Sequence, residues 1–324
     1  MKGTRNVSNQ DKPRVLQIGR LLPWLEEQLA AHFDLVLLAQ QPNPQAYVAE
    51  HGREFVAAVT SAAVGIDAAM IESLPALKVI SSFGVGLDKV DVQAAARRGI
   101  PVGYTPDVLN DCVADTAFTL LLDVARRASE ADRFVRRGAW LTDKFPLATR
   151  ASGKRLGIVG LGRIGRTIAK RASGFDMEIR YHNRRPAEGV DFGYEASLTE
   201  LARWSDFLVV AAAGGAESQG LISAEVLQAL GPQGFLINIA RGTVVDEPAL
   251  IQALRDKAIA GAGLDVYVDE PRVPEALFAL DNVVLLPHVA SATHETRQAM
   301  AALVLDNLLA FFSEGRPKVA APVA

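Results

Sequence analysis

The sequence predicts an α/β protein with two parallel sheets, each doubly wound, with helices on both faces. Short apolar runs alternate with helical patterns along most of the chain, which is typical of this class. The alternation occurs twice, on either side of an irregular segment at 136–155 that is rich in charge, Gly and Pro. At 324 residues, 49% of them hydrophobic, the chain is long enough for two domains with separate cores.

The first set of apolar runs fills the first third of the chain. We expect buried strands at VLQIG (15–19), LVLLA (35–39), FVAAVT (55–60), KVISSFG (78–84) and PVGYT (101–105). The segments at 22–33, 68–74 and 90–99 have helical patterns and lie between these runs. A longer helix should follow at about 113–127, with Asp111 as a plausible N-cap.

The second set predicts a complete doubly wound sheet. Its six expected strands are LGIVG (156–160), EIRYH (178–182), FLVVAAA (207–213), GFLINIA (234–240), AGLDVY (262–267) and NVVLLPH (282–288). A last helix from about Glu295 to Glu314 should end at Gly315. No further strand follows that helix, and periodicity alone leaves open whether it packs on the first domain.

Composition excludes several classes of protein. A net charge of −3 produces no field that attracts nucleic acid or an anionic membrane. The single cysteine, Cys112, excludes an internal disulfide framework and is typical of a reducing compartment. The polar start (1–13) lacks a signal-peptide core, and no run reaches the about 18 apolar residues of a membrane span. We expect a cytoplasmic protein with no metal site.

The segment LGIVGLGRIGRTIAKR (156–171) has the pattern of a dinucleotide-binding loop. Gly160 permits a tight turn, Gly162 lets the backbone approach a pyrophosphate, and Gly165 allows helix and strand to pack closely. The helix that starts at Arg163 and Ile164 directs its first N–H groups at the phosphates. A strand before it, a helix after it and a second strand about 20 residues on strengthen this interpretation.

The end of that second strand, YHNRRP (181–186), favours NADP over NAD. An NAD site has a carboxylate here that binds the ribose 2′-hydroxyl and would repel a 2′-phosphate. This chain has Asn183, Arg184 and Arg185 instead, and guanidinium groups match phosphate oxygens. His182 is either a cofactor contact or a strand-end residue. The alternative for the two arginines is a solvated basic turn, and NAD stays possible.

Hydride transfer to a carbonyl also needs a proton donor, and histidine is the side chain suited to that role near neutral pH. Of the five histidines, His288 comes directly after an apolar strand of the second set, where ligands of open α/β sheets bind. His294, at the start of the next helix, is the second candidate.

Two other strand ends supply partners for His288. Arg241 follows FLINIA, where packing does not explain a charge, and it would bind a substrate carboxylate and polarise the neighbouring carbonyl. Glu270 follows AGLDVYVD and would orient the histidine ring and keep it protonated. On sequence alone, Asp269 and Glu295 compete with Glu270 for that role.

In order and spacing, GLGRIG, INIARG, GLDVYVDEP and LLPHVAS resemble the D-isomer-specific 2-hydroxyacid dehydrogenases. The resemblance covers nearly the whole chain and is nearest to the NADPH-dependent glyoxylate/hydroxypyruvate and hydroxyphenylpyruvate reductases. It implies that Arg241, Glu270 and His288 are catalytic. It also implies that Asp265 binds the nicotinamide carboxamide and that Ile239 and Ala240 line the nicotinamide side. The segment AAAGGAES (211–218) departs from the Pro- and Thr-rich segment of many relatives near the ribose.

The resemblance also implies a domain arrangement and a substrate site. A Rossmann NAD(P)-binding domain (106–289) would be inserted in a flavodoxin-like substrate domain (1–105 and 290–324). Backbone N–H groups of Val85 and Gly86 would bind the substrate carboxylate together with Arg241 and His288. A homodimer is expected through the helix at 113–127. Trp140 would either enter the partner's active site or pack at the dimer interface.

These observations predict NADPH-dependent reduction of a small 2-keto acid, glyoxylate or hydroxypyruvate, to a D-2-hydroxy acid. An aryl-pyruvate reductase, or another D-2-hydroxyacid dehydrogenase that uses NAD, is the alternative within the family. Formate dehydrogenases pair their histidine with glutamine, which Glu270 argues against. A dinucleotide-sensing corepressor scaffold is the alternative from another class, and the absence of a long low-complexity tail argues against it.

Overall fold

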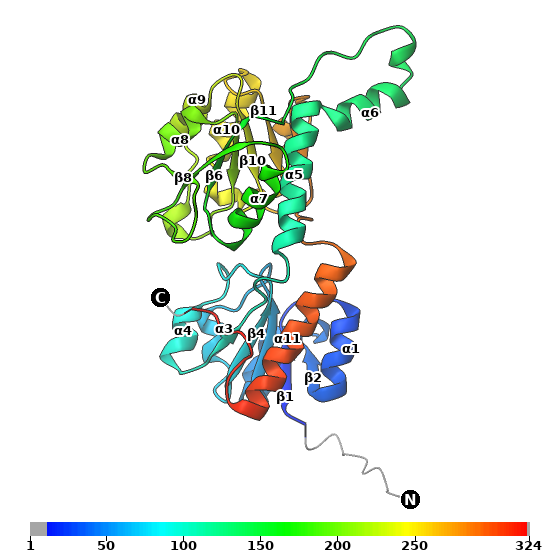
Figure 1. Ribbon diagram of the computed structural model, residues 1–324. Helices are drawn as coiled ribbons and strands as arrows, with labels where there is room; N and C mark the ends of the chain where they lie inside the picture. Colours follow the sequence, from blue (N-terminus) through cyan, green and yellow to red (C-terminus); the bar gives the residue numbers. More distant parts are fainter. Residues whose placement is uncertain (1–11, 323–324) are drawn as a thin grey trace, which may run out of the picture. The chain divides into compact units, whose positions relative to one another are not determined.

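The structure, a computed structural model, describes residues 12–322 (Figure 1). The polar start of the chain up to residue 11 lies outside the described residues. The chain separates into two compact units: Met1–Val108 with Thr293–Ala324, called unit 1, and Leu109–Ala292, called unit 2. In the chain, unit 2 is therefore inserted between the two segments of unit 1.

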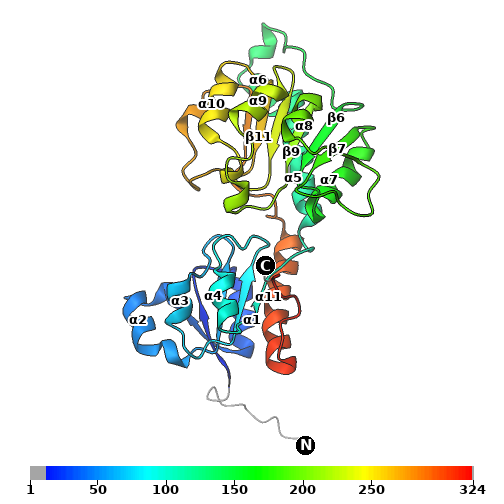
Figure 2. The same ribbon diagram turned by 90° about the vertical axis from the view of Figure 1, so that its left-hand side faces the viewer.

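Unit 1 contains a parallel five-stranded sheet in the order β2-β1-β3-β4-β5, which is the flavodoxin-like order. Helices α1 and α11 cover one face, and α2, α3 and α4 cover the other (Figure 2). The strands are β1 (Arg14–Gln17), β2 (Asp34–Leu37), β3 (Ala57–Ser61), β4 (Val79–Phe83) and β5 (Val102–Gly103). The helices are α1 (Pro23–His32), α2 (Pro44–His51), α3 (Ala68–Glu72), α4 (Val92–Arg97) and α11 (His294–Glu314). The 3₁₀ turns are η2 (Leu38–Gln40) and η3 (Gly52–Glu54).

Helix α11 resolves the question that the periodicity left open, because it packs on the sheet of unit 1. The hydroxyl of Ser81 on β4 donates to the Val304 carbonyl at 3.1 Å, and the amide of Asn307 donates to the Tyr104 carbonyl at 3.1 Å. All four of these residues are buried. Gly315 ends the helix in the left-handed conformation (φ 80°), as the sequence predicts.

Unit 2 contains a parallel seven-stranded sheet in the order β12-β11-β10-β9-β6-β7-β8, the Rossmann order with one added strand. The six expected strands are present, and β8 is a further two-residue edge strand. Helices α5 and α7 lie on one face, and α8, α9 and α10 lie on the other (Figure 1). The strands are β6 (Arg155–Val159), β7 (Glu178–His182), β8 (Gly193–Tyr194), β9 (Phe207–Val210), β10 (Phe235–Asn238), β11 (Gly261–Leu264) and β12 (Val283–Leu285). The α-helices are α5 (Asn110–Arg126), α6 (Ala128–Arg136), α7 (Arg163–Ser173), α8 (Leu198–Trp204), α9 (Ala224–Leu230) and α10 (Glu247–Arg255). The 3₁₀ turns are η4 (Ala139–Leu141), η5 (Ala216–Ser218), η6 (Gly242–Val244) and η7 (Glu275–Leu277).

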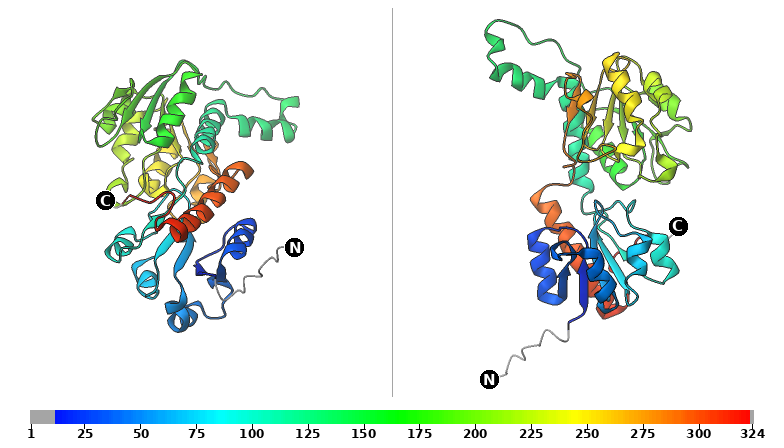
Figure 3. Two further views of the ribbon diagram at one scale, coloured as in Figure 1. Left: turned by 60° about the horizontal axis from the view of Figure 1, so that its bottom comes forward. Right: turned by 180° about the vertical axis from the view of Figure 1, so that it is seen from behind.

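Local structure differs from the sequence prediction in two places in unit 2. Asp111 is not the N-cap of α5: that position is Leu109, and the Asp111 carboxylate accepts a hydrogen bond from Arg171 at 3.1 Å instead. A separate helix, α6, also follows α5, because Arg127 adopts the left-handed conformation (φ 55°) and breaks the helix there. Figure 3 shows that residues 128–150 extend from the end of α5 away from the sheet of unit 2.

Candidate active site

The glycine loop joins β6 to α7, and each of its three positions favours glycine for a different structural reason. A Cβ on Gly160, whose φ is 97°, would lie 2.5 Å from the Ala212 nitrogen, and one on Gly165 would lie 2.2 Å from the Gly160 oxygen. Gly162 has nothing within 4 Å of its Cβ position and is the N-cap of α7. The open space over a helix N-terminus fits a pyrophosphate, which Arg163 and Ile164 would face with their backbone.

The end of β7 holds the glycine loop in place. The side-chain oxygen of Asn183 accepts a hydrogen bond from the Leu161 N–H at 2.7 Å, and the His182 carbonyl accepts one from the Gly160 N–H at 2.9 Å. The His182 ring contacts the Glu195 carbonyl through Nδ1 at 2.9 Å. Asn183, expected as a cofactor contact, therefore also positions the loop that would bind the cofactor.

The two arginines after β7 are exposed to solvent. Arg184, with 85% of its side chain exposed, forms an ion pair with Glu217 from the segment after β9. Arg185 is also exposed. No acid follows β7 directly, so the carboxylate of this corner comes from elsewhere in the chain. Glu217 could not be found from the sequence, because Arg184 and Glu217 are far apart in the chain and become neighbours only through the tertiary fold.

The three expected catalytic residues follow three neighbouring strands of one sheet. Arg241 comes after β10, Glu270 after β11 and His288 after β12, and these strands pair in that order. The carboxyl ends of parallel strands meet at one edge, which brings these segments together. His294 lies in unit 1, at the first position of α11.

The structure selects Glu270 as the partner of His288. The two side chains meet at 2.6 Å between His288 Nδ1 and Glu270 Oε2, and the other Glu270 oxygen accepts the Tyr267 N–H at 3.1 Å. Asp269 pairs with Arg272 at 2.7 Å, and Glu295 lies in the first turn of α11 in unit 1. Engagement of Nδ1 leaves Nε2 as the nitrogen that would exchange a proton with a substrate.

Asp265 fixes the backbone that carries His288. Its buried carboxylate accepts the N–H groups of Val289 at 2.7 Å and Ala290 at 2.9 Å, and burial raises the pKa of this carboxyl above its usual 3.8. His288 itself has φ 53°, a left-handed backbone conformation that residues other than glycine rarely adopt without such support. Each Asp265 oxygen keeps lone-pair capacity for the expected nicotinamide contact.

Buried polar groups also support Arg241. Asn238, which is 1% exposed, accepts the Ala240 N–H and donates to the Arg241 carbonyl, both at 3.0 Å. Arg241 Nη1 donates to the Ala240 carbonyl at 2.7 Å. Ile239 and Ala240, expected beside the nicotinamide, are buried at the end of β10. Sequence reasoning did not single out Asn238, although a polar residue inside an apolar strand was the available signal.

Tyr267 connects the Arg241 and Glu270 segments. A Cβ on Gly242 would lie 1.9 Å from the Tyr267 carbonyl carbon, so the turn after Arg241 packs directly on this residue. The Tyr267 hydroxyl donates to the Leu286 carbonyl at 3.0 Å, and burial raises the pKa of this phenol above its usual 10.0. Tyr267 therefore links the segments that carry Arg241 and Glu270 to the end of β12.

The expected substrate loop lies in unit 1, directly after β4. Gly84 adopts φ 144° and packs against Ala62, and its N–H donates to the Thr105 hydroxyl at 3.0 Å. Val85 and Gly86 follow at the carboxyl edge of the unit 1 sheet and are partly exposed. Between residues 12 and 322, no group of three or more His, Cys, Asp or Glu side chains has the arrangement of a metal site. Over the same range, the helices are too short or too polar to cross a bilayer.

Comparison with known proteins places the chain in a family. Residues 118–290 match the model of the D-isomer specific 2-hydroxyacid dehydrogenase NAD-binding domain. The chain is 49% identical over 303 residues to hydroxyphenylpyruvate reductase of Plectranthus scutellarioides, covering 94% of this chain and 96% of that protein. It is 46% identical over 299 residues to glyoxylate/hydroxypyruvate reductase A of Arabidopsis thaliana, covering 92% and 96%.

A solved structure is similar over nearly its whole length. The NADPH-dependent glyoxylate/hydroxypyruvate reductase of Sinorhizobium meliloti, in complex with NADP and malonate, superimposes with a TM-score of 0.89 at 43% identity. The match covers 96% of this chain and 97% of that one. These findings confirm the expected fold class, the NAD(P) cofactor and the reduction of 2-keto acids as the reaction type. The chain belongs to the D-isomer-specific 2-hydroxyacid dehydrogenases.

Proposed function

We propose that this enzyme reduces glyoxylate or hydroxypyruvate to the corresponding 2-hydroxy acid, with the D configuration at any stereocentre, and prefers NADPH. The observation that carries the proposal is the 2.6 Å contact between His288 and Glu270. This pair lies on the same sheet edge as a glycine loop suited to a dinucleotide. A proton donor and a hydride donor at one edge are the two groups that carbonyl reduction requires.

The chain's own residues would divide the chemistry among them. When bound, the reduced nicotinamide supplies the hydride. Arg241 binds the substrate carboxylate and stabilises the negative charge that develops on the carbonyl oxygen. His288 donates a proton to that oxygen from Nε2, and Glu270 stabilises the charged ring. The N–H groups of Val85 and Gly86 in unit 1 are proposed as further carboxylate contacts.

The NADPH preference is proposed for the corner after β7. Arg184 and Arg185 would bind the 2′-phosphate, because both are exposed and no carboxylate follows β7 to repel it. Gly160, Gly162, Arg163, Ile164 and Gly165 would hold the pyrophosphate. Asp265 would bind the nicotinamide carboxamide while it positions His288.

The substrate is tested by following NADPH consumption with hydroxypyruvate, glyoxylate and hydroxyphenylpyruvate. The proposal expects the largest kcat/KM with one of the two small acids, and chiral analysis should give D-glycerate from hydroxypyruvate. A clear preference for hydroxyphenylpyruvate would favour the aryl-pyruvate alternative. Hydroxyphenylpyruvate is the test substrate for that alternative because the relative from Plectranthus scutellarioides is a hydroxyphenylpyruvate reductase. No turnover with any of the three would favour the scaffold alternative.

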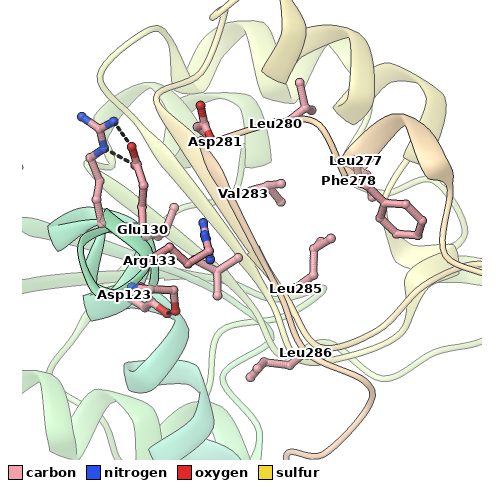
Figure 4. Close-up of a pocket in the computed structure, with 14 residues that line it drawn as sticks. Asp123, Glu130, Arg133, Leu277, Phe278, Leu280, Asp281, Val283, Leu285 and Leu286 are labelled. Carbon is pink, nitrogen blue, oxygen red and sulfur yellow. Dashed lines mark hydrogen bonds and ion pairs between the residues drawn. The ribbon is translucent and has the colours of Figure 1, made fainter. Parts of the chain in front are cut away.

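A homodimer is proposed from two surfaces of unit 2. The segment at 128–150 carries exposed apolar side chains, among them Trp140 at 70%, Leu141 at 91% and Leu147 at 99%. A hollow of about 370 Å³, separate from the catalytic residues, lies between α5, α6 and β12 (Figure 4). Val124, Leu277, Phe278, Leu280, Val283, Val284, Leu285 and Leu286 line it, together with Asp123, Arg127, Ser129, Glu130, Arg133 and Asp281.

The proposed dimer would bury these side chains against a second copy, with Trp140 packed at the interface. Light scattering should give twice the chain mass of 34.7 kDa for the wild-type protein. Leu141→Asp should shift the mass towards the monomer, whereas Val64→Asp, an exposed position in unit 1, should not. A wild-type monomer would contradict the proposal. A cytoplasmic location stays a prediction from the single cysteine.

A further inference from the structure

The Arg184–Glu217 ion pair lies where a cofactor's ribose would be recognised. Glu217 belongs to the 3₁₀ turn η5 in the segment AAAGGAES, which departs from the pattern of many relatives. Arg184 follows β7, and Glu217 follows β9. Strands β7 and β9 flank β6, whose end carries the glycine loop. The two side chains therefore meet from opposite sides of the proposed pyrophosphate site.

The segment that carries Glu217 is fixed to the glycine loop at one end. A Cβ on Gly160 would lie 2.5 Å from the Ala212 nitrogen, so the beginning of this segment packs directly on the loop. Asn183 binds the same loop from the other side through the Leu161 N–H at 2.7 Å. The backbone segments that carry Arg184 and Glu217 are thus both attached close to the proposed pyrophosphate site. This places the ion pair within reach of a ribose bound there.

The tip of the segment contains two glycines with open space around them. Gly215 (φ 132°) and Gly220 (φ 63°) lie on either side of Glu217, and neither has an atom within 4 Å of its Cβ position. Glycines of this kind allow backbone changes at little steric cost. The ion pair is also exposed, with 85% of Arg184 and 77% of Glu217 accessible, and such pairs stabilise a fold by only about 0–1 kcal/mol. An incoming anion can therefore replace the Glu217 carboxylate at Arg184.

We propose that Glu217 supplies the ribose-binding carboxylate that the end of β7 lacks, and so determines how strongly the enzyme discriminates between NADP and NAD. With NAD, the carboxylate remains near Arg184 and accepts a hydrogen bond from the ribose 2′-hydroxyl. With NADP, the 2′-phosphate takes the arginine, and Glu217 must move away from a group of like charge. Glu217 thus favours NAD and limits the preference for NADP. This inference rests on the proposed use of a dinucleotide at this site.

The test is Glu217→Gln, with dissociation constants of NADP⁺ and NAD⁺ measured by isothermal titration calorimetry. The glutamine keeps the size of the side chain and removes the charge. NADP⁺ should bind more tightly and NAD⁺ less tightly, so that the ratio of the two constants changes by about tenfold, equivalent to about 1.4 kcal/mol. The ratio of kcat/KM for NADPH and NADH should change in the same direction. Glu225→Gln is the matched control, because Glu225 is an exposed acid in the first turn of α9.

An unchanged ratio, or a shift towards NAD⁺, would overturn the inference, provided that the variant melts at the wild-type temperature. An equal weakening of both cofactors would overturn it too, because this result would assign Glu217 a role in loop structure alone. Binding distinguishes this failure from failure of the proposed reaction. The wild type and Glu217→Gln could differ as expected in the ratio of their NADP⁺ and NAD⁺ dissociation constants and yet reduce no 2-keto acid. In that case the proposed reaction fails and the role of Glu217 stands.

Discussion

The sheet edge that carries His288 and the corner that carries Arg184 are built in opposite ways. At the catalytic edge, Glu270 binds the histidine and a backbone N–H, while the buried Asp265 holds the two residues that follow His288. At the ribose corner, Arg184 and Glu217 are both more than three-quarters exposed, and glycines with open space around them lie on either side of Glu217. In the proposed function, the groups assigned to the reaction are therefore held by several mutual contacts, whereas cofactor choice would depend on exposed side chains that can be substituted at little cost to the fold.

The largest effect is expected at the catalytic edge. His288→Asn should lower kcat for 2-keto acid reduction by about 10²–10⁴-fold, because it removes the proton donor. The melting temperature should change little, since the His288 side chain is 47% exposed. His294→Asn is the matched control and should retain wild-type kcat. A loss of less than about threefold in His288→Asn would show that another group donates the proton.

Glu270→Gln should give the next largest effect. The amide keeps the shape of the side chain but loses the charge that stabilises the protonated ring, so kcat should fall by roughly 10-fold to 100-fold. Steady-state kinetics with saturating NADPH measures this loss. Asp269→Asn, which alters the neighbouring acid and its pair with Arg272, should leave kcat unchanged. Equal losses in the two variants would mean that Glu270 acts through the fold of the segment alone.

At the ribose corner, the expected change concerns binding and not the chemical step. Arg184→Gln should raise KM for NADPH by about tenfold and leave kcat and KM for NADH nearly unchanged, since the lost contact is with the 2′-phosphate. Arg203→Gln removes another exposed arginine paired with a glutamate in the same unit and serves as the control. A large fall in kcat with both cofactors in Arg184→Gln would contradict this expectation, because it would mean that the ribose corner also affects the chemical step.

The smallest expected effect is the pH dependence of stability at Asp265. Burial raises the pKa of this carboxyl in the folded protein, so its stabilising contribution is complete below the unfolded value of 3.8. That contribution is lost as pH rises through the folded pKa. Relative to Asp265→Asn, the wild-type melting temperature should therefore fall as pH rises through this window. A difference that stays constant or grows with pH would contradict the assigned burial.

Sequence periodicity predicts most of this fold for physical reasons. Strands buried on both faces produce continuous apolar runs such as FLINIA, and six of the seven strands of unit 2 were found in this way. Strand β8 was missed because two exposed residues, Gly193 and Tyr194, leave no such signal. Helix α6 was missed because its charged residues blend into the irregular segment that follows, and α2 was not singled out either.

The candidate site divides in the same way. Arg241, Glu270 and His288 follow predicted strands, so their position at one sheet edge could be inferred from the sequence. The choice of Glu270 over Asp269 needed the resemblance or the structure. The side chains of two adjacent acids point in different directions, and the sequence pattern does not show which of them points towards His288. The Asn183 bond to Leu161 and the Arg184–Glu217 pair depend on loop conformations that no periodicity encodes.

The assignment of the ribose corner to NADPH is tested most directly by kcat/KM for NADPH and for NADH in the wild-type enzyme, with hydroxypyruvate as substrate. We expect turnover with both cofactors and a kcat/KM at least about tenfold higher with NADPH, a difference of about 1.4 kcal/mol at the ribose corner. Equal values, or a preference for NADH, would contradict the assignment of Arg184 and Arg185 to the 2′-phosphate. No turnover with either cofactor would contradict the proposed reaction itself.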